Sequence, residues 1–151
     1  MPTIMRQMNV IARCAVTYKS ERSESDELCG SHHAFVHTIC RHPGISQDAI
    51  AKHTYLNKST VTRTLAYLEE HGFVKRIQDP EDKRSMLVYP TEKLNNIYPS
   101  VRALAKEWND ALAEGIPEEE LEIFNSVLSR MHERAIKLTY SNSNPSDGGH
   151  V

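Results

Sequence analysis

The 151-residue chain has no hydrophobic run that approaches the roughly 20 apolar residues needed to cross a bilayer. Its N-terminal segment also lacks the contiguous apolar stretch of a secretory signal, so we expect a cytoplasmic protein. Only three cysteines are present, an odd number in a chain that is long enough to fold without cross-links, and we expect reduced thiols. Glycine-rich phosphate loops and nucleophile motifs are absent too, so we expect neither an enzyme nor a bound cofactor.

A strong excess of one charge is also missing, since 18 basic and 20 acidic residues leave a net charge of −2. A pI near 6.4 argues by itself against a nucleic-acid partner. The distribution is uneven, however, because the segment 94–151 holds nine acidic and five basic residues, whereas the segment 45–93 holds seven acidic and eight basic ones. The middle of the chain is therefore where an anion would bind.

Hydrophobic spacing predicts a mostly helical chain with one hairpin. Helices are expected over residues 4–18, 31–41, 46–53, 57–71, 91–114 and 117–138. Ser31, Ser46, Asn57 and Thr91 are the expected N-caps, because their side chains can accept hydrogen bonds from the free N–H groups of a first helical turn. Two short strands, 73–77 and 85–89, form a small hairpin, and Pro99 is expected to kink the helix that follows it.

The order helix, turn, helix, hairpin is that of a winged helix-turn-helix. Within the segment 45–93, the runs STVTR (59–63), LEEHGFVKR (68–76), DPEDKR (79–84) and PTEK (90–93) resemble the MarR family of bacterial transcriptional regulators in order and spacing. The resemblance implies an α+β, predominantly α-helical fold, a winged helix-turn-helix with flanking dimerisation helices. It divides a single domain, 1–140, into dimerisation helices at 1–44 and 94–140 and a DNA-binding module at 45–93, while composition predicts a disordered tail at 141–151.

The helix that begins at Asn57 has the chemistry of a DNA-reading helix. Its N-terminus offers unpaired N–H groups and a positive dipole end, which attract phosphate, and Arg63 one turn later can pair with a guanine edge or a phosphate. At the hairpin tip, the resemblance implies that Arg84 enters the minor groove, where negative potential is concentrated, while Asp82 holds the shape of the wing. The predicted DNA contacts are Ser46, Gln47, Asn57, Lys58, Ser59, Thr60, Thr62, Arg63, Lys83 and Arg84.

The expected assembly is a homodimer on double-stranded DNA. Two-fold symmetry would place the two reading helices about 34 Å apart, one DNA turn, and would match a pseudo-palindromic operator. The resemblance further implies a repressor that a small aromatic effector releases. Trp108, Tyr98 and Phe35 are candidates for lining its pocket, although their helical spacing also fits a core.

Two alternative functions fit the same sequence. A thiol-sensing regulator of this fold would use Cys14, and a winged-helix protein-interaction module without DNA binding would suit the acidic overall charge. His33 and His37, one helical turn apart, are spaced for a shared metal ion. Zinc-sensing relatives complete such a site with histidines on the helix after the hairpin, and the segment 94–115 has none, so we expect no metal.

Overall fold

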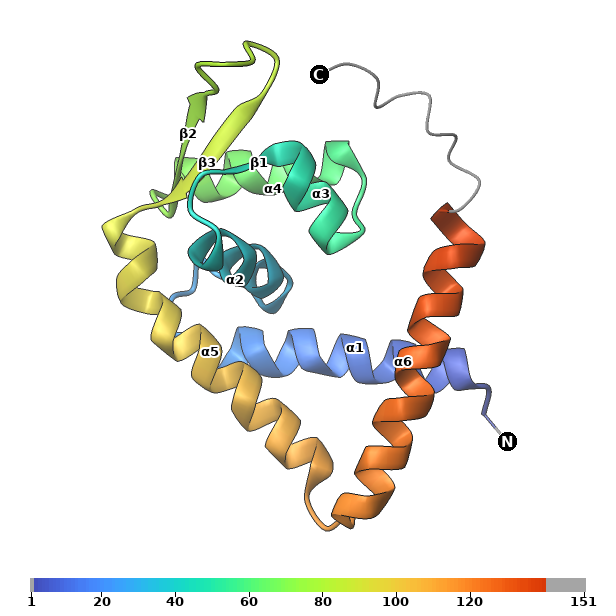
Figure 1. Cartoon of the computed structure of the whole chain (residues 1–151). Helices are drawn as coiled ribbons and strands as arrows, with labels where there is room; N and C mark the ends of the chain where they lie inside the picture. The colour runs from blue at the N-terminus through green and yellow to red at the C-terminus, as the bar shows by residue number, and fades with distance from the viewer. Residues whose placement is uncertain (1, 141–151) are drawn as a thin grey trace. The chain divides into compact units, whose positions relative to one another are not determined.

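The computed structural model describes residues 2–140, and its helices and strands are shown in Figure 1. The elements in chain order are α1 (Ile4–Glu21), the 3₁₀ turn η1 (Gly30–His32), α2 (His33–Arg41), β1 (Ile45–Ser46), α3 (Gln47–Thr54), α4 (Lys58–Glu70), β2 (Val74–Gln78), β3 (Met86–Pro90), α5 (Glu92–Ala113) and α6 (Glu118–Tyr140). The chain divides between Asn109 and Asp110 into two compact units. The tail expected to be disordered lies outside the described residues.

Side-chain caps explain where several of the helices begin. Ser46 accepts a hydrogen bond from the Ala49 N–H at 3.1 Å, and Asn57 accepts one from the Thr60 N–H at 2.8 Å. These bonds satisfy donors that have no partner within the helix, and they confirm the predicted caps of α3 and α4.

The expected cap at Ser31 is wrong, because the chain forms η1 first and α2 begins only at His33. The backbone N–H of Cys29 donates to His32 Nδ1 at 3.3 Å, so a histidine takes part in the turn. The Ser31 hydroxyl lies 2.8 Å from the Cys29 sulfur instead of capping the helix. A serine cap is locally plausible, but a contact with α1 decides the conformation here.

That contact is the close approach of Gly30 to α1. The Gly30 N–H donates to the Ser20 hydroxyl at 2.7 Å. A Cβ atom added at Gly30 would lie 2.3 Å from the Val16 carbonyl oxygen and 2.8 Å from the Val16 Cα, distances that no side chain tolerates. Only glycine therefore allows η1 to pack against the backbone of α1.

The predicted hairpin is confirmed, but the sheet has a third strand that the sequence did not predict. The strand order is β1-β3-β2, with both pairs antiparallel. Ile45 pairs with Val88 and Ser46 with Leu87, so β1 consists of two residues that connect α2 to α3. A strand of two residues is too short to show a period-two pattern in the sequence, and it forms only by pairing with a partner strand.

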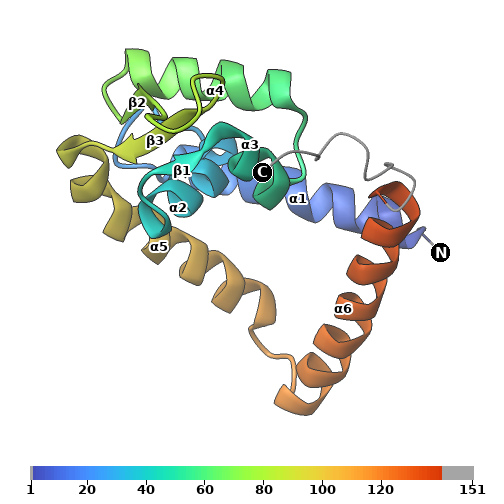
Figure 2. The same cartoon turned by 45° about the horizontal axis from the view of Figure 1, so that its top comes forward.

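The first unit has one hydrophobic core, formed by α2, α3, α4, the sheet and the first half of α5. In Figures 1 and 2, α3 and α4 are neighbouring helices and the β2–β3 hairpin extends beside them. The predicted inward positions of α4, Val61, Leu65 and Leu68, are at most 1% exposed. The other fully buried large residues are Leu28, Val36, Ile39, Ile50, Phe73, Val88 and Leu94. Burial of this face fixes which side of α4 is turned to solvent.

The helices α1 and α6 have no buried residue within their own unit. On α6, Phe124 is 56% exposed and Leu138 is 76% exposed, although both belong to one apolar stripe. α5 continues through Pro99 to Ala113, and Gly115 follows in the left-handed region with φ of 75°. None of the described helices combines the length and the apolar composition required to cross a bilayer.

Candidate nucleic-acid interface

The N-terminus of α4 is a capped and exposed helix end. The side-chain oxygen of Asn57 accepts hydrogen bonds from the Thr60 N–H and from the Ser59 hydroxyl, both at 2.8 Å. Lys58, the first residue of the helix, is exposed, and its ammonium lies 3.4 Å from an Asp48 carboxylate oxygen on α3. Both side chains of this ion pair are mostly solvent-exposed, so it holds Lys58 only weakly. The helix end therefore combines a positive dipole with a lysine available to an anion.

The solvent-facing side of α4 continues this polar surface. Thr62 and Arg63 are exposed on the side opposite the buried Val61 and Leu65. The Thr62 hydroxyl donates to the Lys58 carbonyl at 2.9 Å, which leaves its oxygen as an acceptor. Within residues 2–140, the Arg63 guanidinium has no hydrogen-bond or ion-pair partner. An exposed arginine without an intramolecular partner is free to bind an external anion.

The start of α3 adds a second capped helix end to this surface. Ser46 uses its hydroxyl oxygen as the N-cap, while Gln47 is half-buried as the first residue of the helix. The Gln47 side-chain oxygen accepts a hydrogen bond from Arg76 NH1 at 3.1 Å. Arg76, a residue of β2, therefore fixes the orientation of the Gln47 side chain, which is one of the predicted DNA contacts.

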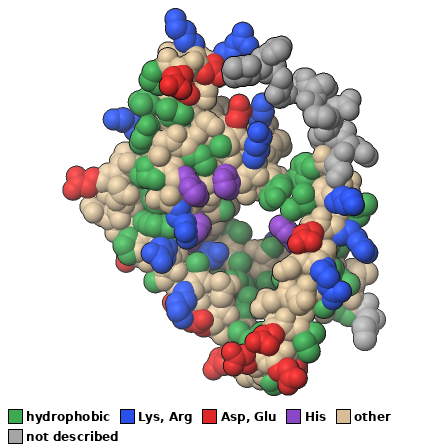
Figure 3. Space-filling model, in the orientation of Figure 1, with side chains coloured by type: hydrophobic (Ala, Val, Ile, Leu, Met, Phe, Trp, Pro, Cys, Tyr) green, Lys and Arg blue, Asp and Glu red, His purple; other side chains and the backbone are tan. Residues whose placement is uncertain are grey.

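The loop between β2 and β3 is shaped by short local hydrogen bonds. The Asp82 carboxylate accepts from the Arg84 N–H at 3.0 Å, and the Asp82 carbonyl accepts from the Ser85 N–H at 2.9 Å. The Gln78 side-chain amide donates to the Lys83 carbonyl at 2.7 Å. Basic side chains stand at the free end of the hairpin in Figure 3, where the chain carries Lys83 and Arg84, both exposed. The loop backbone is thus held while its cations remain in solvent.

The predicted contacts fall into two groups in the structure. Those of α3 and α4 lie on neighbouring helices that are linked by the ion pair between Lys58 and Asp48. Those of the hairpin tip lie at the end of a sheet that packs against α4 through β2. Sequence reasoning missed Arg76 and Glu69, which connect the groups. Arg76 NH2 donates to Glu69 Oε1 at 3.0 Å, a contact between two elements that no linear spacing rule identifies.

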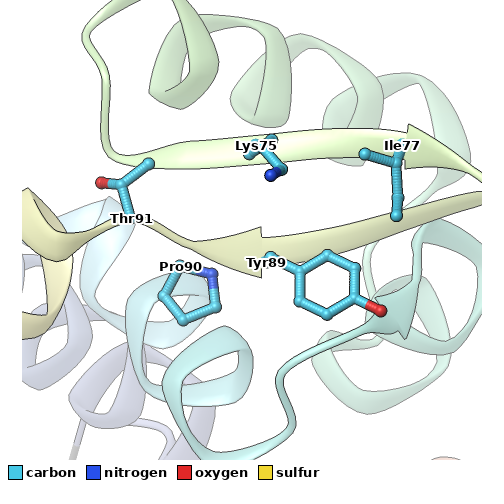
Figure 4. Close-up of a pocket in the computed structure, with 5 residues that line it drawn as sticks. All are labelled: Lys75, Ile77, Tyr89, Pro90 and Thr91. Carbon is cyan, nitrogen blue, oxygen red and sulfur yellow. The ribbon is translucent and has the colours of Figure 1, made fainter.

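A hollow of about 420 Å³ lies on the outer face of the sheet, apart from all the predicted contacts. Figure 4 shows its lining by Lys75, Ile77, Tyr89, Pro90 and Thr91, which come from the two hairpin strands and the residue after them. Lys75 and Tyr89 are cross-strand partners, so they share this face, whereas Arg76 and Val88 share the opposite one. Lys75 therefore offers a control for substitutions of the basic residues of the proposed interface, because it has the same charge and lies on the outer face.

The histidines and cysteines form no cluster suited to a metal ion within residues 2–140. His33 is 5% exposed, and neither of its ring nitrogens has a hydrogen-bond partner in the described structure. Burial, with help from Lys19 and His32, lowers the pKa of His33 to about 4. Burial also raises the pKa of the Cys40 thiol to about 11, so this cysteine stays protonated at neutral pH.

The three candidate pocket aromatics have different environments. Phe35 is 3% exposed and belongs to the core, so it is not available to line a ligand pocket. Trp108 packs against Tyr18 with ring centroids 5.2 Å apart. Tyr98 is half-buried, and its hydroxyl is hydrogen-bonded to His37 Nδ1 at 3.0 Å.

A capped helix pair packed on an antiparallel sheet, with a basic loop at the end of the hairpin, defines a winged helix-turn-helix protein. Residues 31–86 match the model of the MarR family. The chain has the fold of MarR-family transcriptional regulators. The chain is 26% identical over 131 residues to YybA, an uncharacterised HTH-type transcriptional regulator of Bacillus subtilis strain 168, with 87% of each chain covered.

Two solved structures have the same fold. The crystal structure of MarR superposes with a TM-score of 0.78 at 29% identity, covering 91% of this chain and 93% of that one. A putative MarR-family regulator from Listeria monocytogenes, crystallised with a 26mer DNA, superposes with a TM-score of 0.80 at 25% identity, covering 89% of each chain. The winged helix expected from the sequence is therefore confirmed as the fold.

Proposed function

We propose that the chain is a sequence-specific double-stranded DNA-binding regulator of transcription that acts as a repressor. One observation carries the proposal: the neighbouring helices α3 and α4 have N-termini capped by Ser46 and Asn57, and Arg63 on α4 is exposed with no hydrogen-bond or ion-pair partner among residues 2–140. Helix N-termini bind phosphates through their free N–H groups, and an arginine beside them reads guanine. The similar regulator from Listeria monocytogenes, crystallised with DNA, supports the same use of this fold.

The two arginines have different roles in this proposal. Arg63 lies on the exposed face of α4, which enters the major groove, and its bidentate hydrogen bonds to a base discriminate by about 1 to 3 kcal/mol. Arg84 lies in a loop held by Asp82 and inserts into the minor groove, where its contact depends on groove width and phosphate charge. Arg63 therefore contributes to sequence choice, and Arg84 contributes affinity for DNA in general.

Assembly into a homodimer is the second part of the proposal. Ile4 and Ile11 on α1 are 55% and 46% exposed, and Phe124 on α6 is 56% exposed, so apolar positions on two amphipathic helices remain largely uncovered. Helices of this kind bury their stripes against other helices, and a second copy supplies them in a two-fold arrangement. The two copies of α4 would then address a pseudo-palindromic operator.

Release by a small aromatic effector is the third part. Tyr98 is the candidate with an accessible polar environment, since its ring lies 5.9 Å from the Arg102 guanidinium carbon and its hydroxyl contacts His37. An aromatic acid would suit this surface, because the Arg102 guanidinium and an aromatic ring adjoin there. An effector that changes the separation of the two reading helices lowers operator affinity without touching a DNA contact.

Selection of bound fragments from random or genomic DNA tests the DNA-binding part. Affinity for the selected duplex should fall steeply with salt, by about 0.9 log units in the binding constant per log unit of salt for each neutralised phosphate. Arg63→Ala should weaken binding and relax the preference at one base position. Arg84→Ala should weaken binding to all duplexes and reduce the salt slope by about one.

Lys75→Ala is the control for both variants, because it removes a positive charge from the outer face of the sheet. If the wild type binds no duplex at low salt, the DNA-binding proposal is wrong, and the protein-interaction module is the alternative to test next. If Arg63→Ala and Arg84→Ala behave like the control, DNA binding uses another surface.

A further inference from the structure

Arg76 on β2 joins three elements of the proposed DNA-binding module. Its NH1 donates to Gln47 Oε1 on α3 at 3.1 Å, and its NH2 donates to Glu69 Oε1 on α4 at 3.0 Å. The Arg76 backbone N–H donates to the other Glu69 oxygen at 3.1 Å. Only 19% of the Arg76 side chain is exposed, because it lies on the face of the sheet shared with the buried Val88. One guanidinium therefore links both helices to the hairpin.

The contact with Arg76 determines which way the Gln47 amide faces. A guanidinium has only donors, so the Gln47 atom beside it is the carbonyl oxygen. The NH₂ group of Gln47, with two donors, consequently lies on the side of the amide away from that contact. Gln47 is the first residue of α3, the helix that crosses the DNA backbone in a helix-turn-helix. Donors in this place suit a phosphate oxygen.

Glu69 holds the guanidinium in this position. Its two carboxylate oxygens accept from the Arg76 side chain and backbone, so both ends of the arginine are fixed to α4. The hydrogen bonds from Arg76 also lower the pKa of the Glu69 carboxyl, which keeps it ionised. Rotation of Arg76 away from Gln47 would break the NH2 contact with Glu69.

We propose that Arg76 is a positioning residue, which sets the Gln47 amide so that its NH₂ group donates to a DNA phosphate. The proposal rests on the proposed function, because it specifies how one predicted contact of that interface works. It also assigns Glu69 as the residue that orients Arg76. Neither residue touches DNA itself.

Stability alone is a poor reason for this arginine. The Arg76 Nε is buried and has no hydrogen-bond partner among the described residues, and an unpaired buried donor opposes folding. Apolar side chains in place of both Arg76 and Glu69 would avoid that cost, because exchanging a whole ion pair for well-packed apolar groups is often neutral or stabilising. The contact with Gln47 gives the guanidinium a role that an apolar residue cannot fill.

A double-mutant cycle on the full-length chain tests the coupling. The variants are Gln47→Ala, Arg76→Met and the two combined, with Lys75→Met as the control that removes the same charge from the outer face. Affinity is measured on a duplex selected by the wild type, and the free energy of unfolding is measured for each variant in urea. We expect a loss of about tenfold for each single variant, the usual effect of one charge-assisted hydrogen bond, and no further loss in the double variant.

Single methylphosphonate substitutions in the duplex locate the contact. The wild type should lose affinity when one particular phosphate is neutralised, and both Gln47→Ala and Arg76→Met should be insensitive at that same phosphate. If Arg76→Met does not fold, Arg76→Lys replaces it in this measurement. A lysine preserves the charge beside Glu69 but cannot hold both partners in the geometry of a guanidinium, so it too should be insensitive there.

The outcomes separate this proposal from the proposed function. Losses of affinity that multiply in the double variant would overturn the positioning role, as would an Arg76 variant that stays sensitive at the phosphate where Gln47→Ala is not. Both results leave DNA binding intact. A wild-type chain that binds no duplex would instead remove the proposed function, and the positioning role with it.

Discussion

His33 is a buried imidazole that the protein keeps neutral. It is 5% exposed without a hydrogen-bond partner for either nitrogen in the described structure, and its pKa is lowered to about 4. Burial disfavours the charged form, since an imidazolium there would lose its hydration, and Lys19 adds repulsion. The folded protein therefore resists a proton that the unfolded chain accepts at a higher pH.

Stability is predicted to fall in acid because of this residue. Between the usual pKa of 6.5 and about 4, the unfolded chain binds a proton at His33 that the folded chain does not, so the free energy of unfolding decreases as the pH falls through this window. The pKa difference corresponds to about 3 kcal/mol. Urea unfolding of wild type and His33→Leu at several pH values measures it.

The decisive quantity is the difference in the free energy of unfolding between wild type and His33→Leu at each pH. His32 and His37 also have lowered pKa values and lower the stability of both proteins in acid. The wild type should lose stability relative to His33→Leu from neutral pH down to pH 4 and change no further below it. Parallel pH profiles for both proteins would contradict the prediction.

At the scale of single elements, local chemistry determined some features and tertiary contacts determined others. The caps of α3 and α4 were predictable, because Ser46 and Asn57 cap their helices by bonding to residues within three positions along the chain. β1 was not, since its two residues form a strand only by pairing with β3. The connection of Glu69, Arg76 and Gln47 spans three elements, so no rule based on spacing along the chain could identify it.

The junction between η1 and α1 gives a prediction at this scale. Gly30→Ala places a Cβ atom 2.3 Å from a backbone oxygen of α1, which cannot rotate away as a side chain would. The two elements must separate, and we expect a loss of about 1 to 3 kcal/mol in the free energy of unfolding. Urea unfolding measures this loss. Ser31→Ala, one residue later and exposed, is the control and should change stability by less than about 0.5 kcal/mol.

For the whole molecule, the exposed faces of α1 and α6 matter most. The sequence predicts their apolar stripes, and in a single chain Ile4, Ile11 and Phe124 of these stripes remain largely exposed. The spacing of hydrophobic residues reveals that a partner surface is needed, whereas it does not reveal which surface. Dimerisation therefore stays a prediction that a solution measurement has to test.

Phe124→Asp is predicted to dissociate the proposed homodimer. The side chain is 56% exposed on α6, and in a two-fold interface both copies lose its burial, about 1.5 to 3 kcal/mol each. The dissociation constant should rise at least about 100-fold, as measured by analytical ultracentrifugation. Ser126→Asp adds the same charge two positions later, on the face of α6 opposite the apolar stripe, and should leave the dimer intact. A wild type that sediments as a monomer at all concentrations would refute the assembly.

The small sheet has a further property that follows from the placement of Glu69. β2 is an outermost strand of the sheet, and such strands invite other chains to add to them because their backbone donors lack partners. In the middle of β2, the N–H of Arg76 is taken by a carboxylate instead of being left open. A charged side chain thus blocks the middle of an edge strand to which another chain could otherwise add in β-aggregation. It does so beside the proposed DNA-binding surface, which has to stay accessible.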